Sequence, residues 1–509
     1  MNSNLIKIKK VCLAFLLVCV HSIPFASYGQ NKTVLSNESL MDKIKGGWAG
    51  QTIGVTYGGP TEYQYVGITI PDSVNLPWYE GYLKETMIKV PGLFDDLYMD
   101  LTFLDVFDKY GLNVSVDSLA NRFAYADFPL DQANQAARYN IVQGMKAPQS
   151  GYWKNNPHAD DIDFQIEADF IGLMSPGMPN SAAKIADKVG HIMCYGDGYY
   201  GGVYVANMYA LSFTQSDIKE VVKDALRGIP VKSQFYQCIN DVINWYQEDP
   251  SNWRSAWNKL EAKWNNDLCP DGAHAIFNID AKMNSAYIII GLLYGEGDFG
   301  RTIDIATRCG QDSDCNPSSA GGILGTLLGY KSIPSHWKLG MGEIEDLNFQ
   351  YTDISLNKAY TMTLNLAKQQ IKKNGGKVLE NAVEIKNQKI KPVKFEQSFA
   401  GLDAFERKEI WGEIKDTASI DFKGTGIVWR GDVKKIDASS PDYTFLIEVT
   451  VDGVKKETFE MPTDNLKRRR DLYWNFDLKP GVHKVELKVL NPNDKYKINN
   501  LTYVSYDKK

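Results

Sequence analysis

Hydrophobic residues recur every three or four positions along most of the first 375 residues, which is the spacing of helices that bury one face. Several of these segments end in Gly, as helices often do. No alternation of strands with helices accompanies the pattern, and this argues against a Rossmann or barrel fold. We therefore predict a mostly helical region, with helices at 81–88, 96–111, 181–193, 203–213, 217–229, 233–249, 253–264 and 320–330.

From about residue 396 the hydrophobic period changes to two, which is typical of strands with one buried face. Strands are predicted at 418–422, 424–431, 442–453, 455–461, 472–478 and 483–490. A Lys-rich, weakly patterned stretch separates the two regions and looks like a linker with a first strand. Because 509 residues exceed one ordinary core, the predicted fold is multidomain: an all-α domain over 30–375, a linker over 376–395 and a jelly-roll-like β-sandwich over 396–509.

The first 29 residues have the composition of an export signal. Lysines precede the apolar run VCLAFLLVCV, and Ser27-Tyr28-Gly29 places small residues at a cleavage site. The run is too short to span a bilayer comfortably, and Val18 before Cys19 disfavours a lipoprotein signal. We expect an exported protein, periplasmic or secreted, with no integral membrane segment once residues 1–29 are removed.

Net charge and cysteine content limit the kinds of partner and metal site that we expect. A net charge of −6 gives no general attraction to nucleic acid, so no nucleic-acid partner is expected. Five cysteines remain after the signal, and none has the Cys/His spacing of a zinc site. Export permits a disulfide, and buried free thiols explain these cysteines equally well.

Acidic residues gather at three predicted helix ends. Glu62 follows the Gly-rich segment GGWAGQTIGVTYGGPT, Asp95 and Asp96 open a helix, and Asp312 and Asp314 precede AGGILGTLLGY. Taken singly, the aspartates are explained as helix caps near the positive end of a helix dipole. Taken together, packing of these helices would bring four carboxylates into an apolar region, where a cation must compensate them. Hard oxygen ligands select Mg²⁺ or Ca²⁺.

The order of these motifs resembles the ADP-ribosylglycohydrolase family over most of residues 40–335. GWAGQTIGVTYGGPTE looks like its opening helix, and GQDSDCNPSSAGGILGTLLG looks like its closing motif. The resemblance implies an all-α fold, two Mg²⁺ ions and cleavage of glycosidic bonds at ribose C1. By this match Asp95, Asp96, Asp312 and Asp314 are metal ligands, Glu62 is a ligand or the acid/base residue, and Glu62 and Asp96 carry the catalytic roles. The C-terminal region resembles jelly-roll carbohydrate-binding modules.

Two positions depart from the family pattern, which has Thr where this chain has Phe94 and Cys315. A phenyl ring cannot bind a metal, and a thiol is a soft ligand for Mg²⁺. The expected cofactor is therefore Mg²⁺ as one or two ions, with Ca²⁺ as an alternative.

The segment SGYWKNNPHADDIDFQIEAD bears on the substrate, because ADP-ribose-cleaving members carry a Gly/Asn/Arg-containing loop there. Such an acidic run is either a solvated helix start or part of the site. In the site it would repel a diphosphate, since unit charges 4 Å apart interact by ~4 kcal/mol at an effective dielectric constant of about 20. We therefore expect a carbohydrate partner without charge, and assign Asp163, Glu167 and Asp169 to substrate binding.

Other residues have two interpretations each. Asp197 and Tyr199 in YGDGYYGG belong to a substrate loop or to a helix–helix turn, and we assign both to substrate binding. His191 is assigned with them, although histidines at helix ends are often structural. Trp153 is a sugar platform or a core residue. The basic run 467–470 is read as a solvated hairpin tip, with an anionic-glycan patch as the alternative.

The predicted function is that of a secreted glycoside hydrolase, with metal-assisted hydrolysis of a glycosidic bond in a neutral glycan or glycoside. One alternative is a non-catalytic glycan-binding protein on a decayed hydrolase scaffold, which Phe94 and Cys315 favour and the four retained aspartates oppose. A second alternative is hydrolysis of ADP-ribosyl or ribosyl conjugates, which export and the acidic segment oppose.

Overall fold

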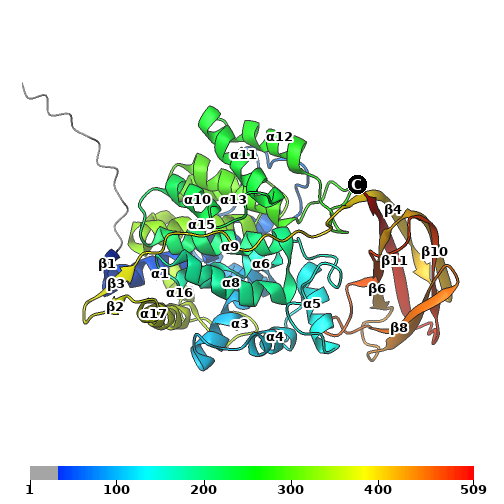
Figure 1. Ribbon diagram of the computed structural model, residues 1–509. Helices are drawn as coiled ribbons and strands as arrows, with labels where there is room; N and C mark the ends of the chain where they lie inside the picture. The colour runs from blue at the N-terminus through cyan, green and yellow to red at the C-terminus, as the bar shows by residue number, and fades with distance from the viewer. Residues whose placement is uncertain (1–31) are drawn as a thin grey trace, which may run out of the picture.

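The computed structural model describes residues 32–509, so the predicted signal segment lies outside the described residues. A large helical domain is followed by a smaller antiparallel β domain, which docks at one end of it (Figure 1). The multidomain, all-α plus β-sandwich prediction is confirmed. Among the described helices, none has the length and apolar character needed to cross a membrane.

The helices of the first domain have the following bounds: α1 Asn37–Gly58, α2 Tyr82–Lys89, α3 Asp95–Tyr110, α4 Val116–Ala124, α5 Gln132–Val142, α6 Asp163–Ile166, α7 Asp169–Leu173, α8 Pro179–Met193, α9 Gly196–Ser212, α10 Ile218–Leu226, α11 Gln234–Glu248, α12 Trp253–Trp264, α13 Ala281–Gly295, α14 Phe299–Arg308, α15 Cys315–Leu328, α16 Met341–Ile344 and α17 Leu356–Lys373. Most segments with an apolar residue every three or four positions form helices. α9 begins at Gly196, so YGDGYYGG is the first part of a helix and the expected loop is wrong.

The stretch predicted as a linker carries two strands. β2 (Lys377–Val378) and β3 (Ala382–Lys386) form a small antiparallel sheet with β1 (Lys32–Ser36), in the order β1-β3-β2. After β3 an irregular segment, 387–401, runs across the helical domain towards the β domain (Figure 1). Its backbone is anchored, since Val393 donates to the carbonyl of Gly228 at 2.9 Å.

The β domain consists of β4 Leu402–Ile414, β5 Thr417–Gly424, β6 Gly426–Lys435, β7 Thr444–Val451, β8 Val454–Pro462, β9 Asp471–Asn475, β10 Gly481–Val489 and β11 Tyr496–Lys508. Its two four-stranded sheets have the orders β5-β10-β7-β8 and β4-β11-β6-β9. The first strand of the domain, β4, pairs with the last, β11, and the second strand, β5, pairs with the seventh, β10. This is the strand order of a jelly roll. Buried residues from both sheets, including Phe422, Trp429 and Leu487, form one core.

An apolar cluster joins the two domains. Trp153 of the helical domain packs between Phe399 and Phe476, with ring centroids 5.4 and 5.3 Å away. Tyr506 of β11 lies in the same cluster and donates to the carbonyl of Leu268 at 2.8 Å. Trp153 is thus a core residue, and the sugar-platform interpretation is wrong.

The end of the basic run 467–470 belongs to this interface, so the solvated-tip interpretation is wrong for Arg469 and Arg470, whereas Lys467 is exposed as expected. Arg469 is 3% exposed and lies over the rings of Phe459 and Trp474. Arg470 forms ion pairs with Asp131 and Asp271 of the helical domain. Large aromatic groups and paired charges therefore fix the β domain against the helical domain.

Candidate active site

Close packing of α1 against α15 positions the acidic residues. The glycines of α1 face the backbone of α15, and a Cβ on Gly46, Gly50, Gly54 or Gly58 would overlap a carbonyl oxygen of Gly325, Gly321, Pro317 or Ser313, respectively. This pairing runs in opposite directions along the two helices, so the end of α1 lies against the start of α15. Only residues without a Cβ permit such an approach. Glu62, four residues beyond α1, therefore lies beside the segment that carries Asp312 and Asp314.

A cavity of 190 Å³ lies where these elements meet. The carboxylates along its wall are Glu62, Asp95, Asp131, Asp163 and Asp312. Cys315 lines it as well, and Tyr63 stands at its edge with its ring 5.3 Å from that of Phe277. The cavity thus brings together one residue or more from each of the three acidic motifs.

Two sets of metal-ligating groups adjoin the cavity and share one residue. Asp95, Asp96 and Cys315 each offer a ligand atom within 4.8 Å of the others, and so do Asp312, Asp314 and Cys315. The four aspartates predicted as ligands are therefore brought together around Cys315. A thiolate is a poor partner for a hard cation, so the carboxylates would provide the ligands for Mg²⁺ or Ca²⁺.

Unpartnered oxygens show that these residues fit a bound cation. Ser318 and Cys315 lie close to Asp96, but among the described residues no donor has ordinary hydrogen-bond geometry to either of its carboxylate oxygens, or to Oδ1 of Asp312 and Asp314. All three side chains are at most 2% exposed. A buried carboxylate without a partner is strongly disfavoured, and a divalent cation would satisfy all of them at once.

The pKa shifts agree with this crowding of charge. Burial, followed by the charges of Asp312 and Asp96, raises the pKa of Glu62 to about 7. Burial likewise raises the pKa of Asp96 to about 7. Burial, then the charge of Glu62, raises the pKa of Asp314 well above its usual range. In the metal-free protein these effects favour the protonated form of Glu62, as an acid/base residue at neutral pH requires.

The acidic segment after Asp160 is buried, so the solvated interpretation is wrong. Asp163 lines the cavity and accepts from the backbone N–H groups of Ala133 and Asn134 at 3.3 and 2.9 Å, which caps the start of α5. Glu167 is fully buried and accepts from the Asn134 amide at 2.5 Å.

Asp169 lies deeper, at the start of α7, and accepts from Gln51 of α1 at 2.5 Å. Neither Glu167 nor Asp169 lines the cavity with Glu62. Of the three acids in this segment that were assigned to substrate binding, the structure places only Asp163 at the cavity wall.

Three other predicted residues lie elsewhere. His191 and Tyr199 line a separate groove with a volume of 1090 Å³, where their rings stand 4.3 Å apart. Asp197 lies in a third cavity, close to Asp280 and Lys282. The structure does not bring these three residues to Glu62, and their role in substrate binding stays a prediction.

Sequence reasoning missed the wall opposite Asp95. It consists of Asp131 and the start of α5, and Arg470 of the β domain pairs with Asp131 there. An acid directly before the helical pattern of 132–142 is a helix-start signal, but nothing local connects it to a residue 339 positions later. Asp131 also contributes to the raised pKa of Glu62.

One family model matches most of the helical domain. Residues 36–367 match the family model for ADP-ribosylglycohydrolase. A solved ADP-ribosylglycohydrolase-related protein complex is similar over 65% of this chain and 99% of that chain, with 14% identity and a TM-score of 0.43. A family GH115 4-O-methyl-α-glucuronidase with specificity for decorated arabinogalactans is similar over 68% of this chain and 44% of that chain, with 11% identity and a TM-score of 0.18. No curated protein matches the chain.

Proposed function

The chain belongs to the ADP-ribosylglycohydrolase family, and on that premise we propose that it is a glycoside hydrolase whose acidic cavity holds one or two divalent cations, Mg²⁺ or Ca²⁺. The observation that carries this proposal is the placement of Glu62 beside Asp95, Asp96, Asp312 and Asp314, several of whose buried oxygens have no partner. Other buried carboxylates of this domain, such as Asp100, Glu167 and Asp169, each accept a hydrogen bond on one oxygen and leave the other oxygen without a partner. Among the described carboxylates, Asp96 is the one with both oxygens buried and unpartnered.

The ligands of the cation would be Asp95 and Asp96 from α3 and Asp312 and Asp314 from the start of α15. When bound, the cation would orient neighbouring sugar hydroxyls and make a water molecule more acidic. Glu62 lines the cavity, where burial raises its pKa in the metal-free protein to about 7, and it would donate a proton to the departing oxygen. Asp96, which is buried next to the cavity-lining Asp95 and has no hydrogen-bond partner among the described residues, is the second carboxylate and would accept the proton of a water bound to the cation.

A neutral sugar fits the wall of the cavity better than a diphosphate does. Glu62, Asp131 and Asp163 line the cavity, and no Lys or Arg of the described residues lines it with them. Arg470, which pairs with Asp131, also pairs with Asp271. Carboxylates accept hydrogen bonds from sugar hydroxyls but repel phosphate oxygens. Tyr63, at the cavity edge beside Phe277, offers an exposed ring against which a sugar can lie.

We also propose that the protein is exported and acts on a glycan in the periplasm or outside the cell. The support for export is the composition of residues 1–29. A signal-peptidase cleavage product that begins at Gln30, detected by N-terminal sequencing of the protein from its native host, is the expected result. An intact N-terminus on cytoplasmic protein would contradict it.

The proposed activity is tested by a screen of purified protein against neutral polysaccharides and nitrophenyl glycosides, with Mg²⁺ or with chelator. We expect release of reducing sugar from at least one neutral substrate, which chelator and Glu62→Gln each abolish. Binding of glycans without hydrolysis would favour the decayed scaffold, a reading that Phe94 and Cys315 support. Faster turnover of ADP-ribosyl conjugates than of any neutral glycoside would overturn the substrate class.

A further inference from the structure

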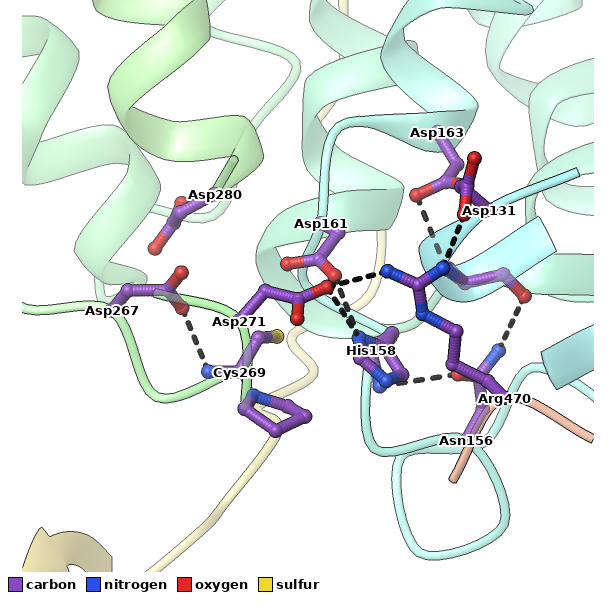
Figure 2. Close-up of polar contacts among 12 residues, drawn as sticks. Asp131, Asn156, His158, Asp161, Asp163, Asp267, Cys269, Asp271, Asp280 and Arg470 are labelled. Carbon is purple, nitrogen blue, oxygen red and sulfur yellow. Dashed lines mark hydrogen bonds and ion pairs between the residues drawn. The ribbon is translucent and has the colours of Figure 1, made fainter. Parts of the chain in front are cut away.

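A second group of buried acids lies at the contact between the two domains (Figure 2), and none of Asp161, Asp267 and Asp271 lines the cavity of Glu62. Most of its carboxylates are paired with cations. His158 is hydrogen-bonded to Asp161 at 3.0 Å and to Asp471 of β9 at 3.1 Å. Asp271 pairs with Arg470 at 2.9 Å and also with Arg430.

Asp267 has no such compensation. Its Oδ1 accepts from the backbone N–H of Cys269 at 2.7 Å, but its buried Oδ2 has no hydrogen-bond partner within residues 32–509. No Lys, Arg or His of the described residues lies within ion-pair distance of it, although the side chain is only 4% exposed. Oδ1 of the fully buried Asp161 likewise has no partner of ordinary hydrogen-bond geometry among the described residues, and the Cys269 thiol lies close to this carboxylate.

We propose that Asp161, Asp267 and Cys269 bind a zinc ion at this interface. Their ligand atoms lie within 4.8 Å of one another, and all three side chains are buried. Two carboxylates with one thiolate suit Zn²⁺, which accepts both oxygen and sulfur ligands, better than Mg²⁺ or Ca²⁺, which select oxygen alone. Three protein ligands leave the fourth tetrahedral position to a water molecule.

The surroundings favour this group over the neighbouring set of His158, Asp161 and Asp271. Asp271 is already bound by two arginines, whose charges would repel an ion. His158 instead holds Oδ2 of Asp161 and leaves Oδ1 free, as residues behind metal ligands commonly do. The backbone is fixed as well, since Ile162 donates to the carbonyl of Ile279 at 2.9 Å.

A zinc ion here would strengthen the attachment of the β domain. Cys269 belongs to the apolar cluster that contains Phe399, Phe476 and Tyr506. The neighbouring Leu268 carbonyl accepts from Tyr506 of β11. The ion would therefore tie the segments around residues 161 and 267 into one rigid surface for the β domain.

The test uses the full-length chain, loaded with Zn²⁺ after removal of metals, and measures zinc per chain by mass spectrometry. Wild type should hold one more zinc than Cys269→Ser or Asp267→Asn, and the control Asp312→Asn should keep that zinc. Replacement by Co²⁺ should give a thiolate charge-transfer band that Cys269→Ser loses and that Cys315→Ser and Cys309→Ser retain.

Equal zinc content in wild type, Cys269→Ser and Asp267→Asn would overturn the proposal. The absence of a thiolate–cobalt band from the wild-type protein would also overturn it, and this measurement does not depend on the folding of any variant. If Cys269→Ser does not fold, Asp267→Asn has nearly the same shape and decides the question, with circular dichroism as the check on its fold.

Discussion

Replacing Gly54 of α1 by Ala tests whether helix packing sets the geometry of the acidic cavity. The added Cβ would overlap the carbonyl oxygen of Pro317 and lie 2.6 Å from the backbone nitrogen of Ser318 in α15. Ordinary contacts of this kind begin at 3.4 Å, so the helices must separate by about 1 Å locally. Asp312 and Asp314 precede α15 directly and would move with it.

The effect on stability should be modest and the effect on the site large. Overpacking costs ~1–3 kcal/mol, and the better helix propensity of Ala offsets ~1 kcal/mol of that loss. The net destabilisation is therefore ~2 kcal/mol or less. By contrast, a displacement of ~1 Å in a positioned group can cost ~100-fold in rate, so Mg²⁺ affinity and hydrolysis should both fall by at least ~10-fold.

Isothermal titration with Mg²⁺ and thermal unfolding of the same samples measure the two effects separately. Gly342→Ala is the matched control, because it also adds a methyl group to a helical glycine but nothing lies within 4 Å of the new Cβ. If folded Gly54→Ala kept wild-type cation affinity, the glycines would not determine where Asp312 and Asp314 lie.

Three other substitutions test separate parts of the account. In metal-free protein, Asp96→Asn should leave the free energy of unfolding unchanged at pH 3 and raise it at pH 8. Burial raises the pKa of Asp96 from 3.8 to about 7, so the folded protein loses stability as the pH rises from 3.8 to 7 and the buried carboxyl group must ionise. Urea unfolding at the two pH values would contradict this if the variant gained nothing at pH 8. Cys315→Thr supplies a hard hydroxyl beside both ligand groups and should tighten Mg²⁺ binding in calorimetry, whereas unchanged affinity would place the side chain away from the ion. Asp471→Asn removes one partner of the buried His158. The charge of Asp471 contributes most to the rise in the pKa of His158. Removing one member of such a buried ion pair lowers the free energy of unfolding by ~3 kcal/mol or more. The β domain should then melt separately in scanning calorimetry at pH 6, with a smaller difference above the raised pKa, where wild-type His158 has also lost its charge.

The sequence predicted the fold well wherever one periodic pattern persisted. The alternation in β5 to β8 and β10 marked most strands of the sandwich, but β4 and β11 were missed. β4 reads LDAFERKEIWGEI, and its charged, half-exposed residues hide the period. β11 is mostly buried towards its end, so its polar residues do not alternate with apolar ones. The pairing of β1 with β3 joins residues about 350 positions apart, and no local signal reports it.

The site was predicted in part, for a physical reason. Asp312 and Asp314 stood before a run of small residues, and close helix packing follows from such a run. Glu167 and Asp169 were assigned to the site because they belong to an acidic run in the segment where ADP-ribose-cleaving members carry a loop. The sequence could not show that Asn134 and Gln51 would pair with them in the interior. Arg470 looked solvated because its partner Asp131 lies in the other domain.

The most direct measurement is titration of chelator-treated, full-length protein with Mg²⁺ and with Ca²⁺ in wild type and Asp312→Asn, with Asp267→Asn as the control from the other acidic cluster. The account predicts that wild type and Asp267→Asn bind at least one of these ions and that Asp312→Asn binds it at least ~10-fold more weakly. Wild-type protein that binds neither ion, or Asp312→Asn that binds as tightly as wild type, would contradict the claim that the carboxylates around Glu62 hold a hard divalent cation.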